Sequence, residues 1–274
     1  MDIKTRFAPS PTGKLHLGGA RTALFNYLFS KYNRGEFFVR IENTDIKRST
    51  LDNAHSIEDS LNWLDIKASS KITFQSENLN RHIEIANHLV KVGFAYKCYL
   101  TNEELEKLRL RSRKSGIPIK SPYRDDLNSN LKKDHVIRLK MPLNGTTLIN
   151  DLVQGKVSVK NEILDDMVLL RKDNTSTYML ASVVDDFDME ITHIIRGDDH
   201  FNNAFRQFQI LKYLKWPIPF YAHIPLIHGE DGTKLSKRHG TNNVTDYKSL
   251  GFEAITLNNY LLRLGYSIND DKIY

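Results

Sequence analysis

The chain has 274 residues, of which 40% are apolar and 26% charged, and its formal net charge is +6. This length suffices for one large domain or two smaller ones with a buried core, while no segment approaches the roughly 20 consecutive apolar residues of a membrane helix. A single cysteine excludes an internal disulfide, so we expect a cytoplasmic protein without a membrane partner, whose positive charge suits a polyanion but does not require one.

The N-terminal segment predicts a nucleotide-binding unit. Residues 3–8 are expected to form a short strand, after which prolines and glycines break the backbone. A helix is expected to begin at Gly18 or Gly19, because apolar residues then recur at helical spacing, and a second strand is expected at 37–42. Strand, loop, helix and strand in this order are typical of the βαβ unit of a parallel sheet.

The middle of the chain has a different pattern, in which helices come first and a polar stretch separates them from short strands. Thr101 and Glu104 have the spacing of a capping box, in which each side chain binds the backbone N–H of the other residue. The elements expected here are helices at 50–64, 80–92 and 101–113 and strands at 136–141 and 167–171. We interpret much of this region as an insertion between two halves of one sheet.

The parallel pattern resumes in the last third of the chain. Its expected elements are strands at 191–196 and 224–227 and helices at 201–211 and 253–264. Gly265 stands directly after the final helix and is a natural terminator, because glycine readily adopts the left-handed conformation at that position.

A glycine-rich segment, RFAPSPTGKLHLGGART at residues 6–22, is the first candidate for chemistry. The free N–H groups and the dipole at the start of a helix favour phosphate, and Gly18 and Gly19 would let a ligand approach the backbone closely. His16, just before the helix, could donate a hydrogen bond to a phosphate oxygen. Taken alone, the segment fits an ordinary glycine-rich surface loop better than a phosphate site.

A basic loop, GTKLSKRHG at residues 232–240, is the second candidate. Lys234 and Lys237 could close on a triphosphate and stabilise the charge that develops as pyrophosphate leaves. Taken alone, such a run of charge is usually a solvated surface loop.

Together the two segments carry a family resemblance. HLGG at 16–19 resembles the HIGH signature of class I aminoacyl-tRNA synthetases, and KLSKR at 234–238 resembles their KMSKS signature. The wider forms are similar to glutamyl-tRNA synthetases in particular: RFAPSPTG, VRIENTD, YMLASVVDD and THIIRGDDH. The resemblance covers essentially the whole chain. It implies an α/β fold, in which a Rossmann-like parallel nucleotide-binding sheet is interrupted by an inserted acceptor-binding α+β domain.

The same resemblance divides the chain into four expected parts. They are the first half of the nucleotide-binding catalytic domain at 1–75, an inserted tRNA acceptor-binding region at 76–175, the second half of the catalytic domain with the KLSKR loop at 176–240, and the start of a stem-contact helical region at 241–274.

Site residues follow from the resemblance, position by position. ATP is expected against His16, Gly18, Gly19, Lys234, Ser236 and Lys237, and the catalytic groups are expected to be His16, Lys234 and Lys237. Glutamate is expected against Arg6, Ala8, Ser10, Glu42, Tyr178 and Arg196. Chemistry agrees with these roles, because a guanidinium fork suits the γ-carboxylate and a carboxylate suits the α-ammonium group. Two positions depart from the family pattern: Asn43 replaces a common Asp, and Ser182 replaces a frequent Asn.

The implied reaction joins glutamate to tRNA in two steps and uses ATP with Mg²⁺. We expect no zinc, because Cys98 has no cysteine partner and a structural zinc site needs four ligands. The expected partner is the acceptor end of tRNA, bound by a monomer that does not read the anticodon, since few residues follow Gly240. The basic stretch at 107–114 fits a tRNA contact and a solvated helix face equally well.

Three alternatives remain open at this point. One is the shorter relative that glutamylates queuosine in tRNA(Asp), against which the KLSKR loop and the missing zinc-type cysteines count. Another is a small-molecule nucleotidyltransferase, which shares a HIGH-like loop but not the expected glutamate pocket. The third is a non-catalytic tRNA-binding module, against which the two signature lysines count.

Overall fold

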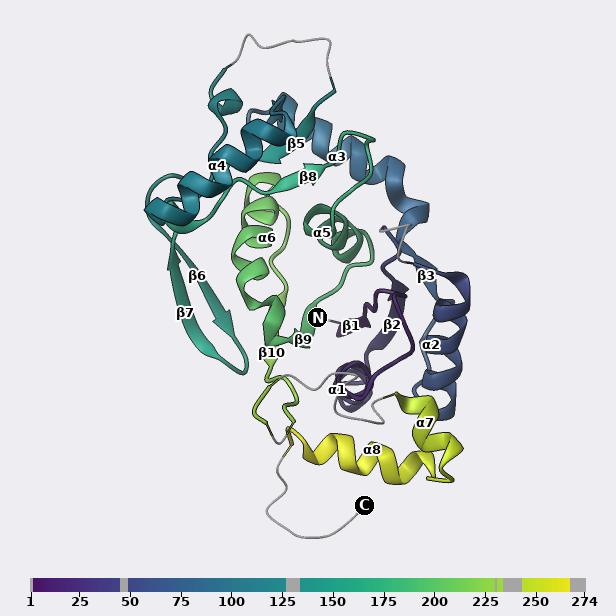
Figure 1. Ribbon diagram of the computed structural model, residues 1–274. Coiled ribbons are helices and arrows are strands. Elements are labelled where there is room, and N and C mark those ends of the chain that lie inside the picture. Colours follow the sequence, from purple (N-terminus) through teal and green to yellow (C-terminus); the bar gives the residue numbers. More distant parts are fainter. Residues whose placement is uncertain (1, 45–48, 127–133, 230, 234–242, 267–274) are drawn as a thin grey trace.

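A seven-stranded sheet in the order β3-β2-β1-β9-β10-β6-β7 forms the centre of the computed structural model, which describes residues 2–44, 49–126, 134–229, 231–233 and 243–266 (Figure 1). Neighbouring strands are parallel except β6 and β7, which form an antiparallel hairpin at one edge. The strands are β1 (Lys4–Phe7), β2 (Glu36–Ile41), β3 (Thr73–Phe74), β6 (Thr146–Asp151), β7 (Gly155–Lys160), β9 (His193–Gly197) and β10 (Phe220–Ile224).

Helices cover both faces of this sheet. Alternate residues of a strand point to opposite faces, so Phe7 and Val39 pack on one side while Ile194 and Tyr221 pack on the other. The first face is covered by α1 (Leu17–Tyr32), α2 (Leu51–Trp63) and α8 (Ala254–Arg263), and the second by α5 (Tyr178–Asp188) and α6 (Phe201–Leu214), while α3 (Leu79–Lys91) packs against α5. The result is the three-layer arrangement of a doubly wound fold.

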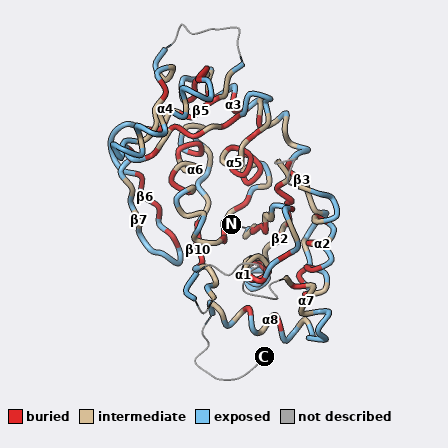
Figure 2. The backbone as a smooth tube through the Cα atoms, viewed as in Figure 1, coloured by how far each residue is buried: buried red, intermediate tan, exposed pale blue. Residues whose placement is uncertain are grey.

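A second, antiparallel sheet lies at the end of the molecule away from α8 (Figure 1). It consists of β4 (Ala95–Cys98), β5 (Val136–Leu139) and β8 (Val168–Leu170), beside α4 (Asn102–Ser115). The remaining elements are α7 (Val244–Ser249) and the short 3-10 turns η1 (Gln75–Asn78), η2 (Pro122–Arg124), η3 (Asn161–Ile163) and η4 (Asp198–His200). Figure 2 shows buried residues along the central strands and α5, whereas α4 is largely exposed and has no buried residue.

The sheet changes winding direction between β1 and β9. From β1 the chain passes through α1 on one face to β2, and from β9 it passes through α6 on the opposite face to β10. In open α/β sheets the crevice at such a switch point, beyond the carboxyl ends of the strands, is where ligands bind. The segments there are residues 8–16 after β1 and η4 after β9.

The α/β class with a mainly parallel sheet is confirmed, and most expected elements form within a few residues of their predicted bounds. The strand expected at 224–227 is wrong: β10 ends at Ile224, because Pro225 has no N–H group to continue the ladder. The β6–β7 hairpin was not predicted, and β6 pairs with β10 in the main sheet although it lies within 76–175. The four-part division of the chain stays a prediction. No helix in the described ranges has the length and apolar character needed to cross a bilayer.

Candidate active site

Helix α1 begins in the crevice, directly after the loop that follows β1. His16 is its N-cap residue, and its Nδ1 accepts a hydrogen bond from the backbone N–H of Gly19 at 3.0 Å. A side chain on Gly18 would come within 3.3 Å of the His16 ring, and one on Gly19 would come within 2.9 Å of Leu15. The glycines therefore let the histidine fold back over the helix end, where N–H groups and the helix dipole favour an anion.

Arg196, at the end of β9, is a buried cation surrounded by neutral groups. It is 6% exposed, and its Nε donates to Nε2 of His223 at 3.0 Å. Its Nη1 donates to the hydroxyl of Tyr178 at 3.1 Å, and its Nη2 lies 3.4 Å from the carbonyl oxygen of His200. In the part of the chain that the structure describes, no carboxylate forms an ion pair with this guanidinium. A buried charge without a counter-ion is costly, so the geometry calls for an anionic ligand here.

Arg6, in β1, is arranged differently. Its Nε and Nη2 donate to the two oxygens of Asp186 in α5, at 3.0 and 3.2 Å. Both groups are buried. This forked pair occupies the planar edge of the Arg6 guanidinium, so of the two predicted arginines Arg196 is the better placed to receive a ligand carboxylate.

A second buried arginine, Arg40 in β2, joins Glu42 to the same cluster. Its Nη1 donates to Asp186 at 2.7 Å and its Nη2 donates to Glu42 at 3.0 Å. Burial raises the pKa of Glu42, although Arg40 opposes that effect. Burial would also raise the pKa of Asp186, but Arg40 and Arg6 outweigh it and hold this pKa below its usual value. The cluster therefore keeps Asp186 ionised and presents an acidic group, Glu42, at the carboxyl end of β2.

Asp185, next to Asp186 in α5, anchors the segment that enters α3. Its carboxylate accepts hydrogen bonds from Gln75 and Asn78 at 2.8 and 2.9 Å, and it lies 2.8 Å from Nε2 of His82. Because the same helix carries Asp186, α5 fixes both the arginine pair and the start of α3.

Tyr178 links the cationic and acidic parts of the crevice. Burial raises the pKa of its hydroxyl, and the charges acting on it include Arg196 and Glu42. Both groups therefore lie within electrostatic reach of one phenol. The hydroxyl also lies 3.1 Å from Nδ1 of His200, which ties α5 to η4.

The other predicted pocket residues have smaller roles in the structure. Ala8 is half-buried and Ser10 is exposed in the loop after β1. Asn43 exchanges hydrogen bonds with Ser76 through both atoms of its amide, each at 2.9 Å. Ser182 is buried, and its hydroxyl accepts from Nε2 of Gln207 at 2.7 Å. The two positions that depart from the family pattern are thus occupied by side chains with local partners.

The signature lysines, Lys234 and Lys237, and Ser236 lie outside the described residues, so their predicted roles stay predictions. The residue that follows that segment is described: Asn243 forms an antiparallel bridge with His16, and the N–H of Val244 donates to the carbonyl oxygen of Leu15 at 2.9 Å. Asn243 and Val244 therefore lie directly beside the start of α1.

Sequence reasoning did not single out Arg40, Asp186, His223 or Asp151. All four are buried, and His223 lies 2.6 Å from Asp151 through its Nδ1. The signal that could have found them is a charged or titratable residue inside an otherwise apolar strand or helix, because such a residue is rarely buried without a partner.

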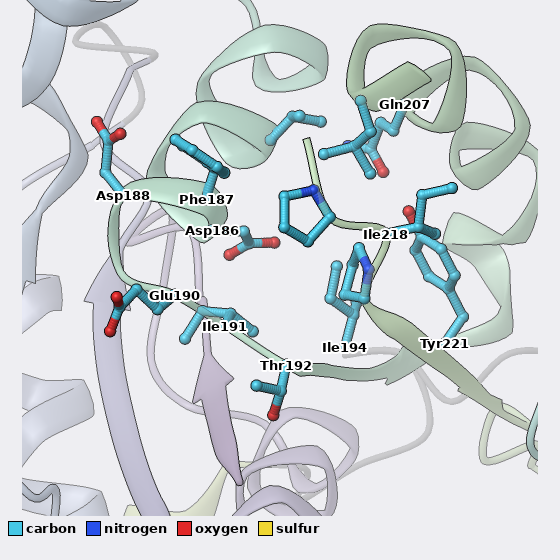
Figure 3. Close-up of a pocket in the computed structure, with 14 residues that line it drawn as sticks. Asp186, Phe187, Asp188, Glu190, Ile191, Thr192, Ile194, Gln207, Ile218 and Tyr221 are labelled. Carbon is cyan, nitrogen blue, oxygen red and sulfur yellow. The ribbon is translucent and has the colours of Figure 1, made fainter. Parts of the chain in front are cut away.

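A cavity of about 610 Å³ lies near the amino-terminal ends of β9 and β10. Figure 3 shows its lining from the end of α5, the segment before β9 and residues 217–219 before β10. It is mainly apolar and contains none of the predicted site residues, so we do not assign the chemistry to it. A smaller cavity of about 270 Å³ lies between Pro11, Asn43 and Phe74.

Metal ligands do not cluster within the described ranges, where no group of three or more His, Cys, Asp or Glu side chains is arranged to hold an ion. Cys98 is buried, and its thiol donates to the hydroxyl of Ser121 at 3.3 Å.

Comparison with known proteins gives one consistent result. The model of the family described as tRNA synthetases class I (E and Q), catalytic domain, matches residues 2–273. The Glutamate–tRNA ligase of Caulobacter vibrioides is 51% identical over 272 residues, covering 99% of this chain and 58% of that protein. Glutamate–tRNA ligase 1 of Orientia tsutsugamushi is 53% identical over 279 residues, with the same two shares. The chain therefore spans a little under three fifths of the length of these relatives.

A solved structure agrees with this result across the fold. A glutamate tRNA ligase from Elizabethkingia meningosepticum, in complex with its amino acid, superposes with a TM-score of 0.89 at 32% sequence identity. The match covers 100% of this chain and 63% of that one.

Proposed function

Because the chain belongs to the family of class I tRNA synthetases (E and Q), through their catalytic domain, we propose that it activates glutamate with ATP and transfers the glutamyl group to the acceptor end of tRNA. The two curated relatives described above are both named as glutamate–tRNA ligases. The crevice between β1 and β9 is the proposed active site.

One observation carries the choice of amino acid: the buried guanidinium of Arg196 is held only by neutral groups among the described residues. A second carboxylate on the substrate would supply the missing negative charge, and Arg is well suited to bind it with two parallel hydrogen bonds. Glutamine would bring a neutral amide to the same place and leave the cation uncompensated. We therefore propose that Arg196, with Tyr178, reads the γ-carboxylate of glutamate.

The α-ammonium group requires a negative partner, and Glu42 is the proposed one. It lies at the carboxyl end of β2 and is held by Arg40 at 3.0 Å. Arg6 acts mainly through Asp186, which keeps the acidic side of the crevice in place. Ala8 and Ser10, in the loop after β1, are proposed to border the bound amino acid.

ATP is proposed to bind where α1 begins. The N–H groups at that helix end suit its phosphates, Gly18 and Gly19 are proposed to let them approach the backbone, and His16 is proposed to donate to a phosphate oxygen. Lys234, Ser236 and Lys237 are proposed to reach the same phosphates, a role supported by the bridge between Asn243 and His16. Mg²⁺ would enter with ATP and lower the negative charge on its phosphates.

The proposed reaction proceeds in two steps. The α-carboxylate of glutamate attacks the α-phosphate of ATP, forming an acyl–phosphate bond and releasing pyrophosphate. The 2′-hydroxyl of the terminal ribose of tRNA then attacks the glutamyl carbonyl, and AMP leaves. The residues of the crevice contribute mainly by positioning the two substrates and by neutralising phosphate charge.

Glutamate-dependent exchange of pyrophosphate into ATP, measured with and without tRNA, tests the proposal. Exchange that requires tRNA is expected, whereas exchange without tRNA would favour the enzyme that glutamylates queuosine. Replacing Arg196 with Gln is expected to weaken glutamate use by roughly 10–100-fold, because a charge-assisted hydrogen bond is lost. Arg171→Gln, at an exposed position, is the matched control. Unchanged preference for glutamate over glutamine in Arg196→Gln would mean that another residue reads the side chain.

A further inference from the structure

Three adjacent strands carry a line of hydrogen bonds that ends on Arg196. Asp151 closes β6, His223 lies in β10 and Arg196 lies directly opposite His223 in β9. The Nδ1 atom of His223 is 2.6 Å from Asp151, and its Nε2 accepts from Nε of Arg196 at 3.0 Å. His223 and Asp151 are both buried, and the proposed mechanism above uses neither.

The protonation of the histidine follows from its two neighbours. Asp151 accepts backbone N–H groups from Val153, Gln154 and His223, and although burial opposes them, these donors hold its pKa below the usual value. Burial and the nearby Arg196 lower the pKa of His223 to about 4, although Asp151 opposes them. The ring is therefore neutral near pH 7.

A neutral imidazole has one N–H group and one lone pair, and the partner of one nitrogen decides the state of the other. Asp151 is ionised and can only accept, so the proton resides on Nδ1 and the lone pair on Nε2 faces Arg196. The opposite tautomer would place an N–H group against the N–H of Arg196. Asp151 thus selects the only ring form that can hold the arginine.

A comparison with Arg6 and Arg40 shows why it matters that the partner of Arg196 is neutral. Arg6 and Arg40 are each bound to carboxylates and are neutralised by them. If a carboxylate stood in place of His223, Arg196 would be neutralised in the same way. A histidine instead fixes the orientation of the guanidinium and leaves its charge for a ligand, while the negative charge of Asp151 stays one ring further away.

We propose that Asp151 and His223 are positioning residues that set the selectivity for an anionic amino-acid side chain, by holding Arg196 in place without neutralising it. This proposal rests on the proposed function, since it assumes that Arg196 binds the glutamate side chain. Neither residue touches the substrate, and both act through Arg196.

The central test is Asp151→Asn. The oxygen of the new amide can still accept the backbone N–H groups, but its NH₂ group donates to Nδ1 of His223 and moves the ring proton to Nε2. Two N–H groups then oppose each other at Arg196. We expect KM for glutamate to rise roughly 10–100-fold with a much smaller change in kcat, while the use of glutamine changes little, so that the preference for glutamate narrows.

Two substitutions of the histidine separate its two bonds. The amide of His223→Gln reaches the position of Nε2 and can accept from Arg196, so this variant should keep the preference for glutamate to within about threefold. The amide of His223→Asn reaches only the position of Nδ1, so it satisfies Asp151 but not Arg196, and it should lose the preference. Asp151→Asn made in the His223→Gln background should add little, because no tautomer remains to be reversed.

The state of the ring is measured separately by ¹⁵N NMR of histidine-labelled protein, with the His223 signals identified by their loss in His223→Gln. Nδ1–H in the parent and Nε2–H in Asp151→Asn are expected. A parent with Nε2–H, or an Asp151→Asn effect of equal size in both backgrounds, would overturn the proposal, since Asp151 would then act only through the fold. A parent that does not prefer glutamate to glutamine would instead overturn the proposed function and the selectivity role with it, whatever the tautomer.

Discussion

Replacing Arg40 with methionine tests how the buried charge cluster is balanced. Arg40 is fully buried, and it donates to Asp186 at 2.7 Å and to Glu42 at 3.0 Å. It also lies 3.7 Å from Asp185. Methionine is an unbranched and adaptable side chain without charge, so the substitution removes a cation from three carboxylates while filling much of the same space.

The size of the effect is set mainly by Glu42. Asp186 keeps Arg6 as a partner, and Asp185 keeps its amide donors. Glu42 has no further side-chain partner among the described residues. Breaking a buried ion pair costs about 3–5 kcal/mol, so we expect Arg40→Met to lower the free energy of unfolding by about that amount. This is a large share of the roughly 5–15 kcal/mol that stabilises a typical domain.

The loss of stability in Arg40→Met should also depend on pH. Arg40 lowers the pKa of both Glu42 and Asp186, so its removal raises both. A carboxyl whose pKa is higher in the folded than in the unfolded state destabilises the fold above its unfolded pKa, near about 4, and this cost disappears as the pH falls. The deficit of the variant should therefore be largest near neutral pH and shrink toward about pH 4, by at most about 1.4 kcal/mol per pH unit for each group.

Urea unfolding followed by circular dichroism at about pH 5 and about pH 8 measures both effects. The matched control is Arg81→Met: Arg81 also contacts two carboxylates, Asp188 at 3.2 Å and Glu84 at 2.9 Å, but it is half-exposed. Exposed ion pairs contribute about 0–1 kcal/mol. An Arg40→Met effect no larger than that of the control, or one that does not change with pH, would refute the reasoning.

Two further substitutions test the packing and the caps. Gly35→Ala should destabilise the fold by about 3 kcal/mol or more, because its Cβ would lie 2.2 Å from the backbone oxygen of Ile3. Gly13→Ala is the control, since a Cβ on Gly13 meets nothing within 4 Å. Thermal unfolding should separate the two alanine variants, and equal melting temperatures would contradict the clash. Thr101→Ala should lower the free energy of unfolding by about 1 kcal/mol, because it removes the hydroxyl that accepts from the backbone N–H of Glu104 at 3.2 Å. In urea unfolding, Thr101→Ser should keep most of this stability. A serine variant as unstable as the alanine variant would contradict the role of the cap.

The sequence predicted correctly those elements whose ends are set by a short local motif. The Thr101–Glu104 capping box forms as expected, and the glycine-rich segment does open a helix, with His16 as its N-cap. The strand expected at 224–227, which is wrong, shows the limit of such rules. The apolar residues after Ile224 suggested a strand there, but a single proline decides the matter, since a strand inside a sheet needs an N–H donor at each pairing position.

Partners from distant parts of the chain could not be predicted in this way. The expected contact of Arg6 with substrate stays a prediction, and the sequence did not indicate its forked partner, Asp186, 180 residues further on. Arg196 has a neutral acceptor because the pairing of β9 with β10 places His223 opposite it. The tautomer of His223 is in turn set by Asp151, which lies in the β6–β7 hairpin that was not predicted. Motifs predicted candidate residues, whereas the charge that each one presents depends on contacts that only the assembled sheet creates.

The position of β1 has a consequence for synthesis on the ribosome. Among the strands of this sheet it is the first to emerge, but it lies in the middle of the sheet, and the hydrogen bond from Lys4 to Thr192 beside β9 spans 188 residues. β2 ends at Ile41 and β9 begins at His193, so at about 5–20 residues per second translation leaves β1 paired on one side only for roughly 8–30 s. An unpaired strand edge can join with other chains, and contacts of such long range also form slowly. A chaperone that shields nascent strand edges would therefore act on this chain mainly in the interval before β9 emerges.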